Sequence, residues 1–248
     1  MMVYWSLALL LPLLVQSLPI TEEDLPIDCE DVFRNGSIHN GVYTIYPVGQ
    51  EVPMEVYCDM GCTDNENHQS HWTVIMRRMD GTVNFDRPYS HYEEGFGNKN
   101  GEYWLGLQNM HLLTYRTKYM LRVDMEDFEG GKVYALYGTF FLESESDGYR
   151  LRVIDFSNGG AGDSLANHNG QRFSTFDRDQ DAWYWGQCNQ DHKWGGFWFH
   201  HCTNANTNGR YQWKNYRVND GSGLNWSGWT VSSLKAISMK VRRLSLDD

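Results

Sequence analysis

Residues 119–126 read YMLRVDME and alternate apolar with charged side chains. Successive side chains of a β-strand point to opposite faces, so this segment predicts a strand that is buried on one face and exposed on the other. The same pattern recurs at 133–142, 149–155 and 238–244. Several such strands at hairpin spacing predict an antiparallel sheet.

The sequence on either side of this predicted sheet has a different character. The upstream part contains short strand candidates at 41–46, 54–58 and 71–78 and a candidate helix, followed by a turn, at 103–113. Downstream, from Ser157 to about Val231, the periodicity disappears and Gly, Asn, Asp and Trp dominate. A long irregular stretch in a compact domain is usually functional, or is held by ions and disulfides.

Composition excludes several classes of protein. The chain has 248 residues and a formal net charge of −11, which argues against nucleic acids and anionic membrane surfaces as partners because the long-range field would repel both. Its 10 Trp, 15 Tyr and 11 Phe argue against disorder. The length allows one large domain, or at most two small ones, with a substantial core.

The N-terminus predicts secretion. Residues 1–17 carry no charged side chain, and their apolar run at 7–15 is too short to span a bilayer, so they predict a signal peptide that is cleaved before Leu18. An uncleaved N-terminal anchor is the alternative. Residues 18–28 are then a short acidic linker, and no later segment is apolar and long enough for a membrane span. We expect the protein in the extracellular space or matrix.

Cysteines tend to pair in the oxidising extracellular environment. The five are Cys29, Cys58, Cys62, Cys188 and Cys202. Spacing favours one local bridge near the start and a Cys188–Cys202 bridge near the end, but it does not choose between Cys58 and Cys62 as the partner of Cys29. The odd count leaves one cysteine for intermolecular pairing or as a free thiol.

Two N-glycosylation sequons begin at Asn35 and Asn225. The first lies in a polar turn and is the predicted glycan site. The second has the bulky Trp226 in its middle position, so its occupancy stays open.

Three carboxylates alternate at Asp177, Asp179 and Asp181 in a polar loop. Calcium takes six to eight oxygen ligands, so clustered carboxylates with backbone carbonyls suit it. The loop is not an EF-hand, because Ala182 and Cys188 stand where that motif needs Gly and Glu. From the residues alone, an acidic solvated turn is an equal alternative.

Enzymatic motifs are weak. GDSL at 162–165 matches a hydrolase nucleophile motif, but no His has an Asp three residues before it, so we expect Asp163 and Ser164 to form a turn. His200, His201 and Cys202 are neighbours in the chain and rarely converge on one zinc ion. Phosphate-binding and dinucleotide-binding motifs are absent. We therefore predict a protein that is not an enzyme.

Motifs in a defined order resemble those of fibrinogen C-terminal-like domains. The first group is DCED at 28–31, GVYTIYP at 41–47 and VYCDM at 56–60. The second is WTVI at 72–75, GFG at 95–97 and GEYWLG at 101–106. The third is FSTFDRDQD at 173–181, N-x-NG-x-Y at 206–211 and GLNW at 223–226.

The resemblance runs from Cys29 to about Arg243 and implies an α+β fold over residues 29–248. A small disulfide-bridged N-terminal part would occupy about 29–70. A central antiparallel sheet with short helices would occupy 71–156 and take back a C-terminal strand within 235–246. A loop-rich part at 157–234 would bind calcium and the ligand.

The resemblance also implies specific pairings. It pairs Cys29 with Cys58, which leaves Cys62 over, and it places a Cys188–Cys202 bridge beside the ligand pocket. Calcium would be held by the carboxylates of Asp177 and Asp179 and by carbonyls near Asp181 and Trp183. The loop that leads to Cys188 is one residue longer than is usual in the family.

The implied ligand pocket departs from the family pattern. Members that bind acetyl groups have His where this chain has Thr203, and often an aromatic residue where it has Asp220. A downstream aromatic segment is shortened to 230–232. Either Trp194, Tyr216 or His201 replaces the missing pocket residues, or the ligand binds at another surface. The family also tends to have a cis peptide bond before Cys202.

We therefore expect a secreted calcium-binding glycoprotein that recognises extracellular matrix proteins or glycans. Flat aromatic rings suit sugars, although most rings between Trp183 and Trp229 are expected to build a core. The alternative is a soluble lectin of innate immunity that recognises acetylated or microbial glycans. A homo-oligomer could form through Cys62 or through domain contacts.

Overall fold

The structure, a computed structural model, describes residues 25–61, 70–190, 194–218 and 221–244. The predicted signal peptide, most of the acidic linker, Cys62 and Asp220 lie outside these residues. In the described part of the chain, no helix is long and apolar enough to cross a membrane.

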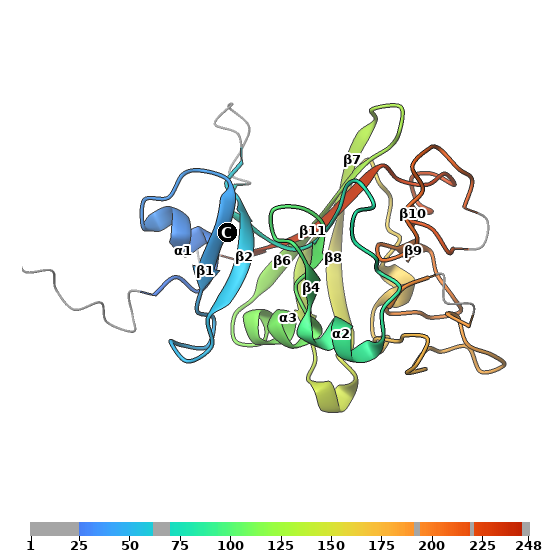
Figure 1. Cartoon of the computed structure of the whole chain (residues 1–248), viewed down its shortest axis with the longest axis horizontal. Helices are drawn as coiled ribbons and strands as arrows, with labels where there is room; N and C mark the ends of the chain where they lie inside the picture. Colours follow the sequence, from blue (N-terminus) through green and yellow to red (C-terminus); the bar gives the residue numbers. More distant parts are fainter. Residues whose placement is uncertain (1–24, 62–69, 191–193, 219–220, 245–248) are drawn as a thin grey trace, which may run out of the picture.

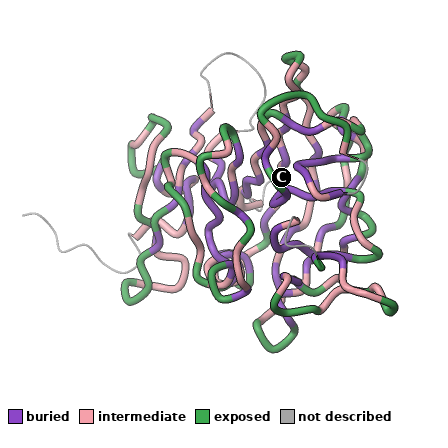
Figure 2. The backbone as a smooth tube through the Cα atoms, turned by 45° about the vertical axis from the view of Figure 1, so that its right-hand side comes forward, coloured by how far each residue is buried: buried purple, intermediate pink, exposed green. Residues whose placement is uncertain are grey.

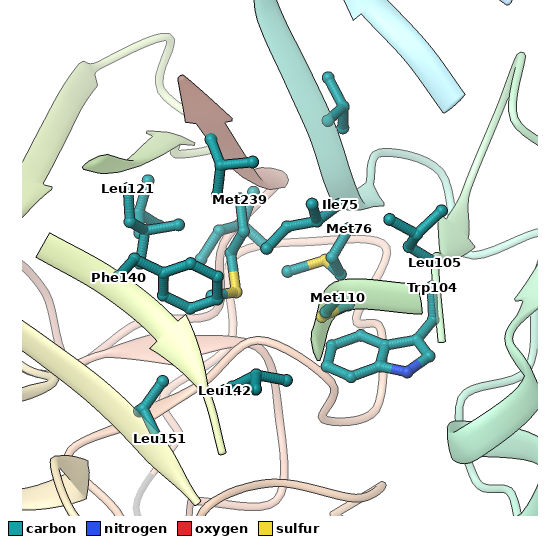
Figure 3. Close-up of a cluster of buried hydrophobic side chains, with 14 of the residues drawn as sticks. Ile75, Met76, Trp104, Leu105, Met110, Leu121, Phe140, Leu142, Leu151 and Met239 are labelled. Carbon is teal, nitrogen blue, oxygen red and sulfur yellow. The ribbon is translucent and has the colours of Figure 1, made fainter. Parts of the chain in front are cut away.

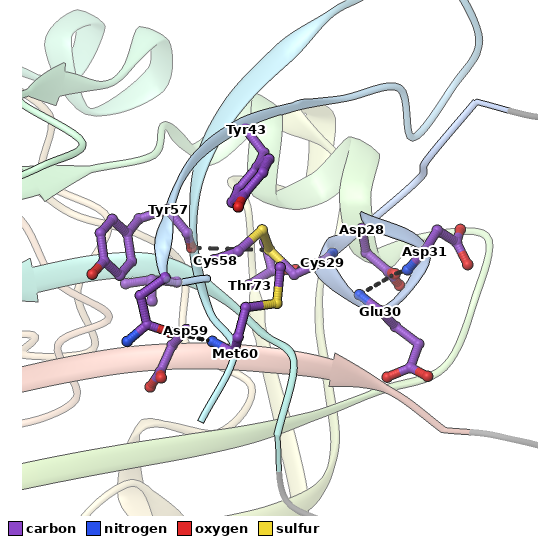
Figure 4. Close-up of a disulfide and its surroundings, with 12 residues drawn as sticks. Asp28, Cys29, Glu30, Asp31, Tyr43, Tyr57, Cys58, Asp59, Met60 and Thr73 are labelled. Carbon is purple, nitrogen blue, oxygen red and sulfur yellow. Dashed lines mark hydrogen bonds between the residues drawn. A yellow bond between two sulfur atoms is a disulfide. The ribbon is translucent and has the colours of Figure 1, made fainter. Parts of the chain in front are cut away.

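The N-terminal part consists of α1 (Cys29–Arg34), β1 (Gly41–Ile45) and β2 (Met54–Asp59). Asp28 caps α1, because its side chain accepts hydrogen bonds from the backbone N–H groups of Glu30 and Asp31. Cys29 is bonded to Cys58 of β2, as the resemblance implies, and this disulfide joins the helix to the hairpin (Figure 4).

The central sheet is antiparallel throughout, with the strand order β1-β2-β3-β11-β6-β7-β8. Its remaining long strands are β3 (Trp72–Arg78), β6 (Tyr119–Glu126), β7 (Lys132–Leu142), β8 (Leu151–Gly159) and β11 (Ala236–Arg243). The C-terminal strand β11 thus returns between β3 and β6 (Figure 1). The predicted α+β architecture, an antiparallel sheet with short helices, is confirmed.

Burial in β6 follows the alternation of the sequence. Leu121, Val123 and Met125 are buried, and the residues between them are half-buried. Their face packs with Phe140 of β7 and Met239 of β11 (Figure 3). Two short helices, α2 (Tyr89–Glu94) and α3 (Leu107–Thr114), belong to the same part of the fold.

The predicted helix at 103–113 begins later than expected. Tyr103 and Trp104 form the short strand β5, which pairs with β3 and with β4 (Phe96–Gly97). Gly106 has φ 109°, a conformation that favours glycine and separates the strand from α3.

The loop-rich part follows β8 and contains little regular structure. Its elements are the 3₁₀ turn η3 (Ala166–His168) and the two-residue strands β9 (Ala205–Asn206) and β10 (Asn225–Trp226), which pair with each other. Figure 2 shows that buried stretches nevertheless run through the loops as well as the strands. This part is therefore packed, although it lacks a long ladder of backbone hydrogen bonds.

Candidate functional site

The aspartate loop at 177–181 is fixed to the rest of the domain by its first carboxylate. Asp177 Oδ1 accepts hydrogen bonds from the Tyr89 backbone N–H at 2.9 Å and from the Thr175 hydroxyl at 2.7 Å. This oxygen therefore anchors the loop to the start of α2.

The other two aspartates lie side by side. Asp181 accepts backbone N–H groups on both oxygens, from Trp183 at 2.9 Å and from Cys188 at 2.7 Å. Burial raises the pKa of the Asp181 carboxyl, and the adjacent Asp179 carboxyl raises it further, against the lowering effect of the two backbone N–H groups. The backbone N–H of Asp181 also donates to Asp179 Oδ1 at 3.2 Å, which places both residues in one turn.

The donor chemistry of this loop suits calcium only if backbone oxygens take part. Among the described residues, no three His, Cys, Asp or Glu side chains lie close enough together to hold a metal ion. A site built on Asp179 and Asp181 would need carbonyls and solvent to complete it, which is an all-oxygen set of the kind calcium takes. The resemblance assigns the carboxylates of Asp177 and Asp179 to this set.

A disulfide ties this loop to the predicted ligand region. Cys188 is bonded to Cys202 with a Cα–Cα distance of 5.4 Å, and the His201–Cys202 peptide bond is cis. The His201 ring packs edge-on against Trp183, with ring centroids 5.7 Å apart. The aspartate loop and the 200–203 segment are therefore one connected structure.

Of the four ligand candidates that the structure describes, Thr203 and Trp194 lie together. A Cβ added at Gly221 would meet Thr203 Cγ2 at 2.6 Å and the Trp194 ring at 3.0 Å, so these two side chains close tightly over that glycine. The Thr203 hydroxyl donates to the Ala205 carbonyl. His201 is against Trp183, and Tyr216, which is 55% exposed, is tied by its backbone to Ser233. Asp220 lies outside the described residues.

His168 supports this region, and no spacing pattern in the sequence pointed to it. It is fully buried, and its Nδ1 lies 2.7 Å from the Trp198 carbonyl while its Nε2 accepts the backbone N–H groups of Asn204 and Ala205. Nδ1 is therefore the donor, and the ring is neutral. Burial lowers the pKa of His168 to about 4, which agrees with that assignment.

The hydrolase-like GDSL segment has structural roles in this fold. Ser164 is buried and its hydroxyl oxygen accepts the Gly228 backbone N–H at 2.8 Å. Asp163 accepts the Tyr137 hydroxyl and the backbone N–H groups of Leu165 and Ala166. Asp163 forms a local turn, as the sequence predicts, whereas Ser164 holds the Gly228 backbone, 64 positions away.

The two sequons differ in accessibility. Asn35 is exposed at the C-terminal end of α1, where a glycan can be attached. Asn225 is buried in β10, with only 8% of its surface exposed, so the folded domain does not present it.

The profile of the C-terminal globular domain of fibrinogen beta and gamma chains matches residues 25–244. The chain belongs to the fibrinogen C-terminal domain family. Two solved structures share its fold. The fibrinogen-like globe domain of human ANGPTL2 is 40% identical, with a TM-score of 0.80, and the match covers 88% of this chain and 98% of that chain. Lamprey fibrin D-dimer in complex with the peptide Gly-His-Arg-Pro-amide is 35% identical, with a TM-score of 0.77, and the match covers 94% of this chain and 80% of that chain.

Among curated members of this fibrinogen C-terminal domain family, human microfibril-associated glycoprotein 4 is 47% identical over 225 residues, which cover 88% of this chain and 85% of that protein. The runs GEYWLGLQNMHLLT at 101–114 and GGAGDSL at 159–165 predict this likeness, and it is confirmed. Human fibrinogen C domain-containing protein 1 is 43% identical over 226 residues, which cover 88% of this chain but 47% of that protein.

Proposed function

We propose that this domain is a secreted, non-enzymatic recognition module that calcium stabilises and that binds components of the extracellular matrix. The observation that carries the calcium proposal is the aspartate loop, in which three carboxylates alternate at Asp177, Asp179 and Asp181 and Asp179 Oδ1 accepts the Asp181 N–H at 3.2 Å. A cation between them would remove their mutual repulsion and stabilise the loop that the Cys188–Cys202 disulfide connects to the 200–203 segment.

The matrix proposal is supported by the relative that is 47% identical over most of its own length and is named for an association with microfibrils. The buried Ser164 and the neutral, fully bonded His168 support a role without catalysis, because neither is available as a nucleophile or a base. Secretion follows from the signal peptide that the sequence predicts.

Acetyl-sugar binding at the predicted pocket is less well supported. The Thr203 hydroxyl is bonded to a backbone carbonyl, and Thr203 and Trp194 close over Gly221. Among the described ligand candidates, those two are together while His201 and Tyr216 lie against other residues. We therefore favour recognition of matrix components over the alternative function as a lectin.

The calcium proposal is tested by thermal unfolding with and without 1 mM calcium chloride. At 100 times Kd, a ligand stabilises the folded state by about 2.7 kcal/mol, so the wild-type Tm should rise by several degrees. The double variant Asp179→Asn with Asp181→Asn should lose this rise.

Asp155→Asn is the matched control, because Asp155 is an exposed carboxylate outside the aspartate loop. It should leave both the Tm and its calcium-dependent rise unchanged. If the double variant keeps the full rise, calcium is held elsewhere. Binding of the same proteins to immobilised elastic microfibrils, compared with albumin, tests the partner class separately.

A further inference from the structure

A groove of about 650 Å³ lies on the face of the central sheet that points away from the core. Its described walls come from β2, β3, β6, β7 and β11, and Figure 1 shows β11, β6 and β7 next to one another. The volume is within the range of ligand sites, which is roughly 300–1,000 Å³. The described residues that line the groove include neither a predicted ligand candidate nor a member of the aspartate loop. The groove is therefore separate from the site described above.

The groove exists because a small residue lies in the middle of a row of large ones. Ser238 of β11 pairs with Arg77 of β3 on one side and with Asp124 of β6 on the other. Asp124 in turn pairs with Tyr134 of β7. Side chains that are paired across a sheet point to the same face, so these four form one row. The short side chain of Ser238 leaves space between its neighbours.

Two arginines in the groove are each stacked on a tyrosine. The Arg77 guanidinium lies 4.1 Å from the centroid of the Tyr57 ring, and that of Arg122 lies 4.0 Å from the centroid of the Tyr134 ring. Stacking holds the plane of a guanidinium in place and leaves its edge available for hydrogen bonds. Both charged groups are therefore oriented before any ligand arrives.

Arg77 has hydrogen-bonding capacity that is accessible. Its Nε donates to the Gly101 carbonyl at 2.8 Å and its Nη2 donates to the Lys99 carbonyl at 2.7 Å, and both acceptors are neutral. Among the described residues, no carboxylate forms an ion pair with Arg77. Its Nη1 makes no hydrogen bond with these residues and is not a buried atom, so solvent reaches it. Arg77 thus offers a charged donor to an anionic ligand.

The groove has an excess of positive charge. The cations in it and directly beside it are Arg77, Arg122, Lys132, Lys235 and Lys240, and the carboxylates are Asp59, Asp124 and Glu126. Arg78 also lines the groove, but the buried Glu102 compensates its charge. Five cations therefore face three carboxylates, on a chain whose net charge is −11. Such a local excess attracts an anionic partner.

The groove is also long and partly apolar. From β3 across β11 and β6 to β7 there are three strand spacings, or about 14 Å, which about four residues of an extended peptide span. The rings of Tyr57 and Tyr134 line it, as does Met79, which is 45% exposed. A small inorganic anion would leave this apolar surface uncovered. An extended peptide covers it, because such a peptide presents a carboxylate and an apolar side chain to the same surface.

We propose that this groove binds an extended acidic segment of a partner protein. One carboxylate of the segment accepts a hydrogen bond from Arg77 Nη1. A neighbouring apolar side chain of the segment fills the space over Ser238, between Tyr57 and Tyr134. This site goes beyond the proposed function and needs neither calcium nor the aspartate loop.

Fluorescence anisotropy on the folded wild-type domain tests the proposal. The probe is a fluorescein-labelled octapeptide, EDLEDLED, either face of which presents carboxylates and a leucine when it is extended. It should bind with a Kd of about 100 μM. Its amide counterpart, QNLQNLQN, has the same apolar content and should bind at least about tenfold more weakly, as should the octapeptide to Arg77→Gln, since a hydrogen bond between charged groups contributes on that order.

Two further variants separate the groove from surface charge in general. Ser238→Gln fills the space between the tyrosines without changing any charge, and it should weaken binding about as much as Arg77→Gln does. Arg116→Gln is the matched control, because Arg116 is an exposed arginine that does not line the groove. It should bind the octapeptide as the wild type does.

NMR on the wild type gives a readout that does not depend on any variant folding. Titration with the octapeptide should shift the backbone amide signals of Arg77 and Ser238 and leave that of Ile154, on the edge strand β8, unchanged. Chelation of calcium should leave octapeptide binding intact, so failure of the calcium proposal and failure of this one are distinguishable.

Equal binding of the acidic and amide peptides, or unchanged binding in Ser238→Gln, would overturn the proposal. It would also fall if the octapeptide did not bind but a heparin hexasaccharide did and lost its binding in Arg77→Gln, because the partner would then be a sulfated polysaccharide. Sedimentation that shows self-association of the wild type but not of Arg77→Gln, again without octapeptide binding, would make the occupant a second copy of this chain.

Discussion

The central sheet and the loop-rich part bury their backbone in different ways. In the sheet, the strands pair continuously and alternate apolar residues fill the core. In the loop-rich part, pairing is limited to two-residue strands and isolated bridges. Most of the buried polar side chains lie in the loop-rich part. They supply the hydrogen bonds that paired strands supply in the sheet.

Asparagines illustrate this substitution. Asn189 donates to the Gly195 carbonyl, Asn206 donates to the carbonyls of Trp194 and Gly221, and Asn208 donates to the Gly196 carbonyl. Each side chain thus satisfies a buried backbone group that has no strand partner. The comparison teaches that an irregular region can be as tightly specified as a sheet when side chains supply its hydrogen bonds.

Trp198 joins the two regions, and its removal should have the largest effect. The ring is fully buried against Trp104 and Phe173, and its indole N–H donates to the Tyr149 carbonyl at 2.8 Å. Trp198→Ala should cost about 3–5 kcal/mol, because it creates a cavity and leaves a carbonyl unpaired. Urea unfolding measures this, and a loss below 1 kcal/mol would mean that the two regions are not one cooperative unit.

The different bonding of the two regions also decides what the sequence could predict. YMLRVDME has a period of two, so its strand and its buried face follow directly from the pattern. The turn at Asp163 was predicted too, since Asp favours turns. His168, Asn206 and the Glu102 carboxylate could not be predicted, because their partners are backbone groups distant in the chain and leave no period.

The ligand region shows the same limit. The resemblance implied both disulfides, and the structure has them. Asp177 is held by the backbone N–H of Tyr89, 88 positions away, and no pattern in the sequence points to that contact.

The asparagine network is tested by Asn206→Ala. Its side chain is fully buried, donates to the carbonyls of Trp194 and Gly221 and accepts the Asn208 N–H. The change should cost about 2–3 kcal/mol, since buried partners lose their hydrogen bonds. Hydrogen exchange should quicken more in the loop-rich part than in β6 and β7. Equal quickening in both regions would contradict the division of roles.

His168 should make the loop-rich part sensitive to acid. Burial lowers its pKa from 6.5 to about 4, so the unfolded chain binds a proton more readily than the folded one. The stabilisation is full above pH 6.5 and is lost as the pH falls toward 4. Between pH 7 and pH 5 the loss should be about 2 kcal/mol.

His168→Gln isolates this contribution from the carboxyl groups that also titrate. The variant should be less stable than the wild type at pH 7 but should lose less on acidification. Urea unfolding at pH 7, 6 and 5 gives the difference, and parallel pH profiles for the two proteins would rule out His168 as the source.

The smallest loss of stability is expected from Trp185→Ala. This variant compares an exposed tryptophan with the buried Trp198. Trp185 lies only 13 positions before Trp198 but is 84% exposed, and its described ring contact is with the equally exposed Tyr184. Little apolar surface is buried there, so the free energy of unfolding should change by less than about 0.5 kcal/mol. A loss near that of Trp198→Ala would mean that the exposed ring packs on part of the domain in solution, and the aromatic content of this region would then be core rather than surface.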